Sequence, residues 1–352
     1  MTAAPPAATT SATTPAIEIR GLTKRFGSVV AVDNLDLDIP SGVVFGLLGP
    51  NGAGKTTTIR LLTGVARPTS GSATIAGTDV GSSSGIDARR RIGVLDQEPR
   101  FYGWMSGREL LAFVGDLVGL DGKALEARID ETLEIVGLTD AADRRIGGYS
   151  SGMRQRLGIG QAIIGKPEIL ILDEPVSSLD PEGRRDLLAL IGGLRESATV
   201  VFSTHVLSDV ERVCDRVAIL DRGRLVAEAP IDDLLSRFAP PTYRIEAEPG
   251  QSARLEALTG GLKRQPWVTE TQADGDQLRV SVADNDRAAV ELLPLVAAVG
   301  LRVITFERER PTLEDAFLRL VGHDEAPTED EAAAGDDAAG AADEAGAAEP
   351  AP

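Results

Sequence analysis

The stretch that decides the fold is Gly49-Pro50-Asn51-Gly52-Ala53-Gly54-Lys55-Thr56. It follows an apolar run at residues 43–48, which predicts a buried strand, and it precedes residues 57–62, which read as a helix. Strand, Gly-rich loop and helix in this order are the setting that a phosphate-binding loop requires. Glycines let backbone N–H groups point at an anion, and the helix N-terminus adds positive partial charge. We therefore predict that residues 49–56, together with Thr57, bind a nucleoside triphosphate.

Two side chains of this loop carry the expected chemistry. Lys55 supplies a compact positive charge for the β- and γ-phosphates, and the Thr56 hydroxyl is placed to bind Mg²⁺. The chain holds only five Lys against 31 Arg, so a chance match to the motif is rare. The competing interpretation is a Gly-rich turn that binds nothing.

Composition bounds the class of protein. A chain of 352 residues is long enough for two or three domains, and a hydrophobic content of 42% is normal for a globular protein. No apolar run approaches the roughly 20 residues that cross a bilayer, and the N-terminus lacks the pattern of a secretory signal. We expect a cytoplasmic protein, in which the single cysteine, Cys214, is a buried structural thiol.

Charge is spread unevenly along the chain. The formal net charge is −18, and residues 323–352 hold ten of the 54 carboxylates without any Lys or Arg. We predict that the Ala/Pro/Thr-rich lead at residues 1–15 and the acidic tail at residues 322–352 are disordered. The tail is either a solvated segment or a docking element for a basic partner. The acidic balance argues against nucleic acid as the main ligand.

The chain divides at Pro240-Pro241 into two folded units. Residues 16–238 read as one α/β unit with a mixed sheet, and residues of about 100–165 form a mostly helical subdomain. A hairpin is expected around residues 221–223. Residues 241–321 show the order strand, helix, two strands, helix, strand, which predicts a small α+β domain of the ferredoxin-like type.

An acidic pair follows one predicted central strand. Asp173 and Glu174 come directly after the apolar run at residues 169–172. Carboxylates at the end of a buried strand are well placed to face a bound nucleotide. We expect Asp173 to hold Mg²⁺ and Glu174 to orient and deprotonate the attacking water.

A second anion-binding element precedes this pair. Residues 149–153 read Tyr-Ser-Ser-Gly-Met and open a predicted helix. With the motifs above, they make the chain resemble the ATP-binding subunit of an ATP-binding cassette (ABC) transporter, whose LSGGQ-type signature precedes its Walker B strand. The resemblance implies that Ser150, Ser151 and Gly152 close over the γ-phosphate held by a second copy of the chain. Two copies would pair head to tail, with ATP and Mg²⁺ between them.

The other motifs of the family follow in order. The resemblance implies that Gln97 contacts Mg²⁺ and water and senses the membrane partner, that Asp180 shapes the dimer interface, and that His205 contacts the γ-phosphate. It also implies that Phe26 stacks on adenine, although ordinary packing is the alternative. Ser151 and Met153 depart from the signature, which bears on turnover rate, whereas the presence of both Glu174 and His205 favours a hydrolysing cassette.

Aromatic residues gather just after Gln97. Phe101, Tyr102 and Trp104 are three of the chain's 13 aromatic residues. They either pack locally in the helical subdomain or form a contact surface for a helix of a membrane partner. In the resembled family this region borders the groove that receives such a helix.

A shorter resemblance narrows the function. Residues 310–320 look like the closing helix of drug-exporter ATPases of the daunorubicin-resistance type, while the alternative is a helix that docks on the small domain. The main hypothesis is an ATPase that powers export of a drug-like or antibiotic-like small molecule through a separately encoded permease, at the inner face of the membrane. The alternatives are import, lipid or polysaccharide export, or a soluble ATPase of translation or DNA repair.

Overall fold

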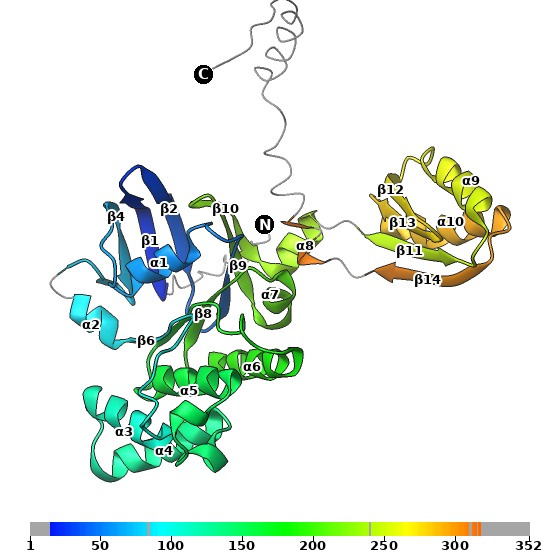
Figure 1. Cartoon of the computed structure of the whole chain (residues 1–352). Coiled ribbons are helices and arrows are strands. Elements are labelled where there is room, and N and C mark those ends of the chain that lie inside the picture. The colour runs from blue at the N-terminus through cyan, green and yellow to red at the C-terminus, as the bar shows by residue number, and fades with distance from the viewer. Residues whose placement is uncertain (1–14, 83–84, 239–240, 310–311, 315, 318–352) are drawn as a thin grey trace, which may run out of the picture.

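The computed structural model describes residues 15–82, 85–238, 241–309, 312–314 and 316–317. The segments predicted to be disordered lie outside these residues, apart from Pro15. Three sheets organise the described chain (Figure 1).

The central sheet has six strands in the order β10-β9-β3-β8-β7-β6. All neighbours pair in parallel except β9 and β10, which form the predicted hairpin. Every residue of β3, β7 and β8 is buried, as expected for strands covered on both faces. The strands are β3 Val44–Leu48, β6 Ile92–Leu95, β7 Ile169–Leu172, β8 Thr199–Thr204, β9 Arg216–Asp221 and β10 Arg224–Pro230. The predicted mixed sheet is confirmed.

A second, antiparallel sheet has the order β2-β1-β4-β5. Its strands are β1 Ile17–Phe26, β2 Val29–Ile39, β4 Ser70–Ile75 and β5 Thr78–Asp79. The end of β2 alternates buried Leu and Ile with exposed Asp, because one face meets the core and the other meets water. Helix α1, Lys55–Leu62, shares one apolar core with this sheet and with β3.

Most of the described chain between β5 and β11 that lies outside the central sheet is helical. A subdomain of α3, α4 and α5 has its own contacts between helices and sits below the central sheet in Figure 1. Ser106 and Glu109 form a reciprocal capping box at the start of α3. The helices are α2 Gly85–Arg90, α3 Gly107–Leu117, α4 Gly122–Ile135, α5 Ser151–Ile163, α6 Pro181–Gly193, α7 Leu207–Val213 and α8 Ile231–Phe238, with short 3₁₀ turns at Thr139–Ala141, Ile146–Gly148 and Leu194–Glu196.

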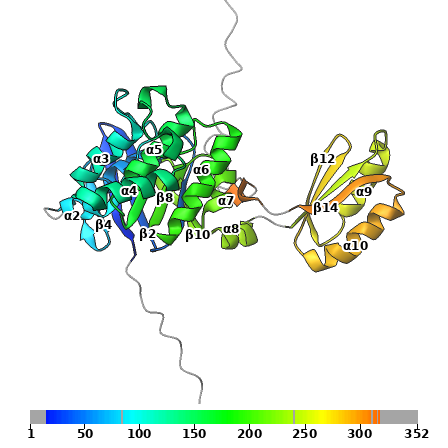
Figure 2. The same ribbon diagram turned by 90° about the horizontal axis from the view of Figure 1, so that it is seen from below.

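The small domain is built on the third sheet, whose order is β12-β13-β11-β14. Its elements are β11 Thr242–Ala247, α9 Ser252–Leu262, β12 Val268–Asp274, β13 Gln277–Val282, α10 Asn285–Ala298 and β14 Val303–Glu309. Figure 2 shows both helices together beside this sheet, and their buried side chains join those of β11 and β13 in one core. This chain order and sheet order confirm the predicted ferredoxin-like fold.

The described C-terminal residues pack against elements that precede the small domain in the chain. Leu313 lies in an apolar cluster with residues of α7, β9 and α8, and Phe317 packs against the same cluster. The alternative reading, in which this segment docks on the small domain, is wrong for the described residues. Cys214 also packs here, and burial raises the pKa of its thiol well above the usual value, as a structural role predicts.

Close packing of α5 on the central sheet gives a test of the fold. A Cβ atom on Gly93 of β6 would lie 2.0 Å from the carbonyl oxygen of Ala162, so backbone must move to admit it. We expect Gly93→Ala to lower the free energy of unfolding by about 2–3 kcal/mol, measured by thermal unfolding. Gly193→Ala is the control, because a Cβ there meets nothing within 4 Å. Equal melting temperatures for the two variants would contradict this packing.

Candidate nucleotide-binding site

The Gly-rich loop joins the end of β3 to the start of α1. Gly54, the residue before the helix, has a φ of 101°, in the left-handed region. A Cβ there would lie 2.6 Å from the carbonyl oxygen of Ala31, so both the backbone angle and the space require glycine. Having no side chain, Gly54 cannot cap the first turn of α1, and the N–H groups of that turn are left for an anion.

Lys55 lies buried under the loop, with 5% of its surface exposed. Its Nζ donates hydrogen bonds to the carbonyl oxygens of Gly49 at 2.7 Å and Pro50 at 3.1 Å, and it lies 3.7 Å from Oε1 of Glu174. Burial lowers the pKa of Lys55, and the nearby carboxylates of Glu174 and Asp173 only partly oppose that effect. A bound polyanion would restore the stability of the charged ammonium.

Asp173 and Glu174 directly follow β7 and are both buried. The Thr56 hydroxyl lies 3.3 Å from Oδ1 of Asp173, so the loop and the acidic pair meet directly. Ser203 joins the two carboxylate residues: its hydroxyl donates to Oδ1 of Asp173 at 2.6 Å and accepts the backbone N–H of Glu174 at 2.9 Å. Glu174 has a φ of 42°, which is strained for a residue with a side chain, and the Ser203 hydrogen bond helps to hold it.

His205 completes this group. Its Nδ1 lies 3.2 Å from a carboxylate oxygen of Glu174. The meeting follows from the sheet register, in which Leu172 of β7 pairs with Phe202 of β8 and Leu48 of β3 pairs with Thr204. Parallel strands end at the same edge, so the residues after them converge there.

The structure therefore brings together Lys55, Thr56, Asp173, Glu174 and His205. Among the described residues, no hydrogen bond or ion pair joins Ser150, Ser151 or Gly152 to this group. Ser150 instead caps α5 and accepts the Met153 N–H at 3.2 Å.

Two other predicted residues stand at exposed positions. Asp180 precedes α6 and leaves its side chain exposed. Phe26 is 54% exposed, with Nζ of Lys24 4.9 Å from its ring centre. Both are accessible to a ligand or a second chain.

Gln97 follows β6 and is exposed. Its backbone oxygen lies 3.3 Å from Nε2 of Gln155, a buried residue of α5. Oε1 of Gln155 is buried and has no hydrogen-bond partner in the part of the chain that the structure describes. The helix that opens with the signature residues is thus attached to the Gln97 loop.

Sequence reasoning missed Ser203 and Gln155 as site residues. The sequence offered little signal for either residue, because Ser203 precedes Thr204 in β8 and Gln155 stands between Arg154 and Arg156 in α5. Ser203 is fully buried in β8, and Gln155 sits among buried residues of α5.

The donors for a metal ion are few. Thr56 and Asp173 present oxygen atoms side by side, and within the described residues no cluster of three or more His, Cys, Asp or Glu side chains is arranged to hold a metal. Such a sparse set fits Mg²⁺, which keeps several waters and binds through one or two carboxylates together with substrate phosphates.

Comparison with known proteins decides the family. Residues 32–177 match the family model for ABC transporters, and residues 230–321 match that for the C-terminal domain of DrrA1-3-like ATP-binding proteins. The chain is 39% identical over 305 residues to YxlF, an uncharacterized ABC transporter ATP-binding protein of Bacillus subtilis, a match that covers 87% of this chain and 99% of the relative. This chain belongs to the ABC transporter family. It is an ATP-binding protein and an ATPase of that family.

Two further comparisons agree with this membership. The ABC protein is 37% identical over 321 residues to the daunorubicin/doxorubicin resistance ATP-binding protein DrrA of Streptomyces peucetius, which covers 90% of this chain and 96% of that protein. A solved structure of an ATP-binding subunit of an ABC transporter matches with a TM-score of 0.57 and 28% identity, over 63% of this chain and 92% of that one.

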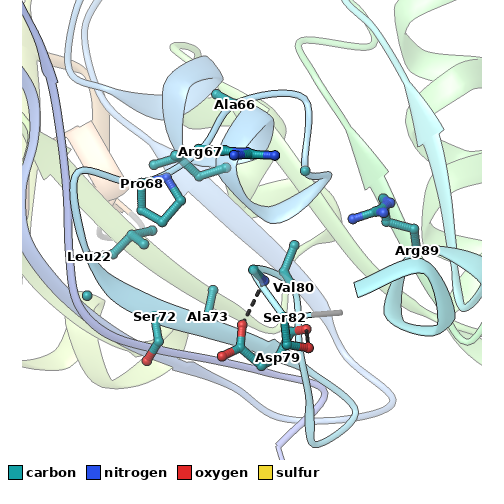
Figure 3. A pocket seen from close by; sticks show the side chains of 14 residues that line it. Leu22, Ala66, Arg67, Pro68, Ser72, Ala73, Asp79, Val80, Ser82 and Arg89 are labelled. Atoms are coloured by element: carbon teal, nitrogen blue, oxygen red, sulfur yellow. Dashed lines mark hydrogen bonds between the residues drawn. The ribbon is translucent and has the colours of Figure 1, made fainter. Parts of the chain in front are cut away.

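A hollow of about 720 Å³ lies beside the loop that follows α1 (Figure 3). The loop after α1, the strand β4 and the turn after β5 line it, with Arg67 and Arg89 among the side chains drawn. None of the predicted site residues lines this hollow. In this ABC protein, the converging side chains of Lys55, Thr56, Asp173, Glu174 and His205 mark the candidate site.

Within the described parts of the chain, the structure has no helix with the length and apolar character that a bilayer crossing needs.

The Ser203 bridge gives a test of the site geometry. Ser203→Ala leaves the buried N–H of Glu174 without its acceptor, and we expect a loss of about 1–3 kcal/mol in the free energy of unfolding. Thermal unfolding without nucleotide measures it. Ser197→Ala is the matched control, because its exposed hydroxyl bonds only to the local carbonyl of Leu194. Equal melting temperatures for Ser203→Ala and Ser197→Ala would show that the Ser203 bridge does not stabilise the site.

Proposed function

We propose that this chain is the ATP-hydrolysing subunit of an exporter for drug-like or antibiotic-like small molecules, and that its permease is encoded separately. In this proposal residues 16–238 form the cassette and residues 241–321 an accessory domain. The direction and class of cargo are supported by the relative from Streptomyces peucetius, which is named for daunorubicin and doxorubicin resistance, and by the match to the C-terminal domain of such proteins.

The observation that carries the ATPase role is the contact chain Lys55–Glu174–His205 beside Thr56–Asp173–Ser203, in which Lys55, Glu174, Asp173 and Ser203 are buried. The loop of residues 49–56, with Thr57, binds the phosphates through backbone N–H groups, and the Lys55 ammonium neutralises their charge. Phe26 stacks on the adenine from its exposed position.

Glu174 acts as general base for hydrolysis. It orients a water for attack on the γ-phosphorus and accepts its proton, while the bond from that phosphorus to the leaving ADP oxygen breaks. His205 holds the Glu174 carboxylate and contacts the γ-phosphate, and Gln97 positions the same water. Phosphoryl transfer depends mostly on such positioning and on charge neutralisation, which these fixed groups supply.

Thr56 and Asp173 would hold Mg²⁺, with Gln97 reaching it as the site closes. The ion, when bound, neutralises charge on the β- and γ-phosphates. The contact between the two side chains across 3.3 Å supports this assignment.

A second copy of the chain completes the site. Ser150, Ser151, Gly152 and Asp180 stand apart from the Lys55 group within one copy, and the Ser and Asp residues are exposed. A head-to-tail pair would place Ser150, Ser151 and Gly152 against the γ-phosphate of the partner copy and Asp180 in the dimer interface, which would be two-fold and self-complementary.

The permease would contact the aromatic surface after Gln97. Trp104 is 66% exposed and Tyr102 is 61% exposed, with ring centres 5.8 Å apart, whereas Phe101 packs against the core. Large exposed aromatic side chains favour a protein contact. Binding there would hold the subunit at the inner face of the membrane.

The general-base assignment has a direct test. Glu174→Gln keeps the shape but not the basicity of the side chain, so ATP should still bind while hydrolysis falls about 10²–10⁴-fold. We expect the ATP-bound dimer to accumulate, as seen by gel filtration with ATP alongside an ATPase assay. Glu182→Gln on the exposed start of α6 is the control. Normal turnover in Glu174→Gln would refute the assignment.

The aromatic surface is tested in the assembled transporter. Trp104→Ala should leave the basal ATPase rate of the isolated subunit unchanged, because the side chain lies outside the Lys55 group, but it should weaken the stimulation of ATPase by the permease. Val290→Ala removes a similarly exposed apolar side chain from the small domain and serves as control. Unchanged transport and unchanged stimulation of the ATPase by the permease in Trp104→Ala would contradict this role of the aromatic surface.

A further inference from the structure

The described C-terminal residues 312–317, without residue 315, are here called the C-terminal strap. Leu313 is fully buried and shares an apolar cluster with the side chains Leu48, Val210, Val217, Ile219, Ile231 and Leu234. The backbone N–H of Leu313 donates a hydrogen bond to a carboxylate oxygen of Glu211. Figures 1 and 2 show the short orange end of the described chain beside α7 and α8, apart from β14.

The strap contacts the helix that follows His205. Both Val210 and Glu211 belong to α7, which has only seven residues. A helix of this length is not stable by itself and depends on the contacts around it. Two of those contacts come from the strap: Leu313 belongs to the apolar cluster that contains Val210, and its backbone N–H donates to Glu211.

The opposite support of α7 comes from α6. Arg184 forms a bidentate ion pair with Asp209, at 2.8 and 2.6 Å. The turn into α7 is held by the Thr204 hydroxyl, which accepts the N–H of Val206 at 3.0 Å. Helix α7 is therefore held between α6 and the strap, one or two turns beyond His205.

The same cluster reaches the phosphate loop. Leu48 is the last residue of β3 and directly precedes Gly49. Because Leu313, Leu48 and Val210 belong to one buried cluster, the strap shares its packing with the residue before the loop and with the helix after His205. A simple tether for the small domain would require neither a buried side chain at this place nor a directed hydrogen bond to α7.

We propose that the strap is a positioning element for hydrolysis, with Leu313 and Glu211 as positioning residues that hold α7 so that His205 stays against Glu174. The inference rests on the role given to His205 under the proposed function. Loss of the strap contact lets α7 and His205 shift, which slows the chemical step while nucleotide binding at the loop remains.

The first experiment uses full-length variants in a steady-state ATPase assay. We expect Leu313→Ala and Glu211→Ala to lower kcat about ten-fold or more, with KM and the affinity for a fluorescent ATP analogue within about two-fold of the parent values. Glu211→Gln should keep most of the rate, because its amide oxygen still accepts the Leu313 N–H. Leu292→Ala is the matched control, since it removes an equally buried Leu from the core of the small domain.

The second experiment is a double-mutant cycle with His205→Ala under single-turnover conditions. We expect Leu313→Ala to cause no further loss in the His205→Ala background, because the strap acts through that side chain. An equal fold-loss in both backgrounds, or the same kcat loss in Leu292→Ala, would overturn the proposal. A full rate in His205→Ala would refute the proposed role of His205 and the inference with it, whereas a slow His205→Ala beside a fast Leu313→Ala overturns the inference alone.

Discussion

The buried ammonium of Lys55 is the constraint on which the rest of the site depends. A cation with so little exposure loses most of its hydration, and burial outweighs the attraction of Glu174 and Asp173 in setting its pKa. The loop carbonyls that accept its hydrogen bonds fix the ammonium but do not neutralise it. The fold therefore holds a positive charge in a place that favours a polyanion, and the glycine backbone keeps side chains out of the space around it.

The central sheet makes this arrangement possible from distant parts of the chain. The ends of β3, β7 and β8 lie at one edge because their residue pairs are in parallel register. That edge collects Lys55, the acidic pair, Ser203 and His205, and the Ser203 hydroxyl ties two of the strand ends together. Rigid strands covered on both faces suit a site whose chemistry depends on fixed positions of its groups.

Sequence reasoning reached the fold and the main contacts of the site because both follow from local patterns. The loop of residues 49–56 and the carboxylates after a buried strand each carry a recognisable local context, whereas His205 was assigned through the resemblance to the ABC family. Ser203 was missed because a hydroxyl in a β-branched run reads as ordinary strand composition. The surface on which Leu313 packs could not be predicted from the sequence, because the apolar face of a short helix does not specify its partner.

Helix α7 gives the small domain a physical connection to the chemistry. It follows His205, its Asp209 is paired with Arg184 on the helix that begins beside Asp180, and its outer side receives the strap. Asp180 is expected to face a second copy, so α6 and α7 form one continuous set of contacts between that interface and the C-terminal segment. These contacts can couple the dimer interface to the C-terminal segment only if the element between the two sites can adopt two arrangements. A seven-residue helix supported from outside on both sides is the part of this cassette best suited to have them, because its position costs little to change once one support is lost.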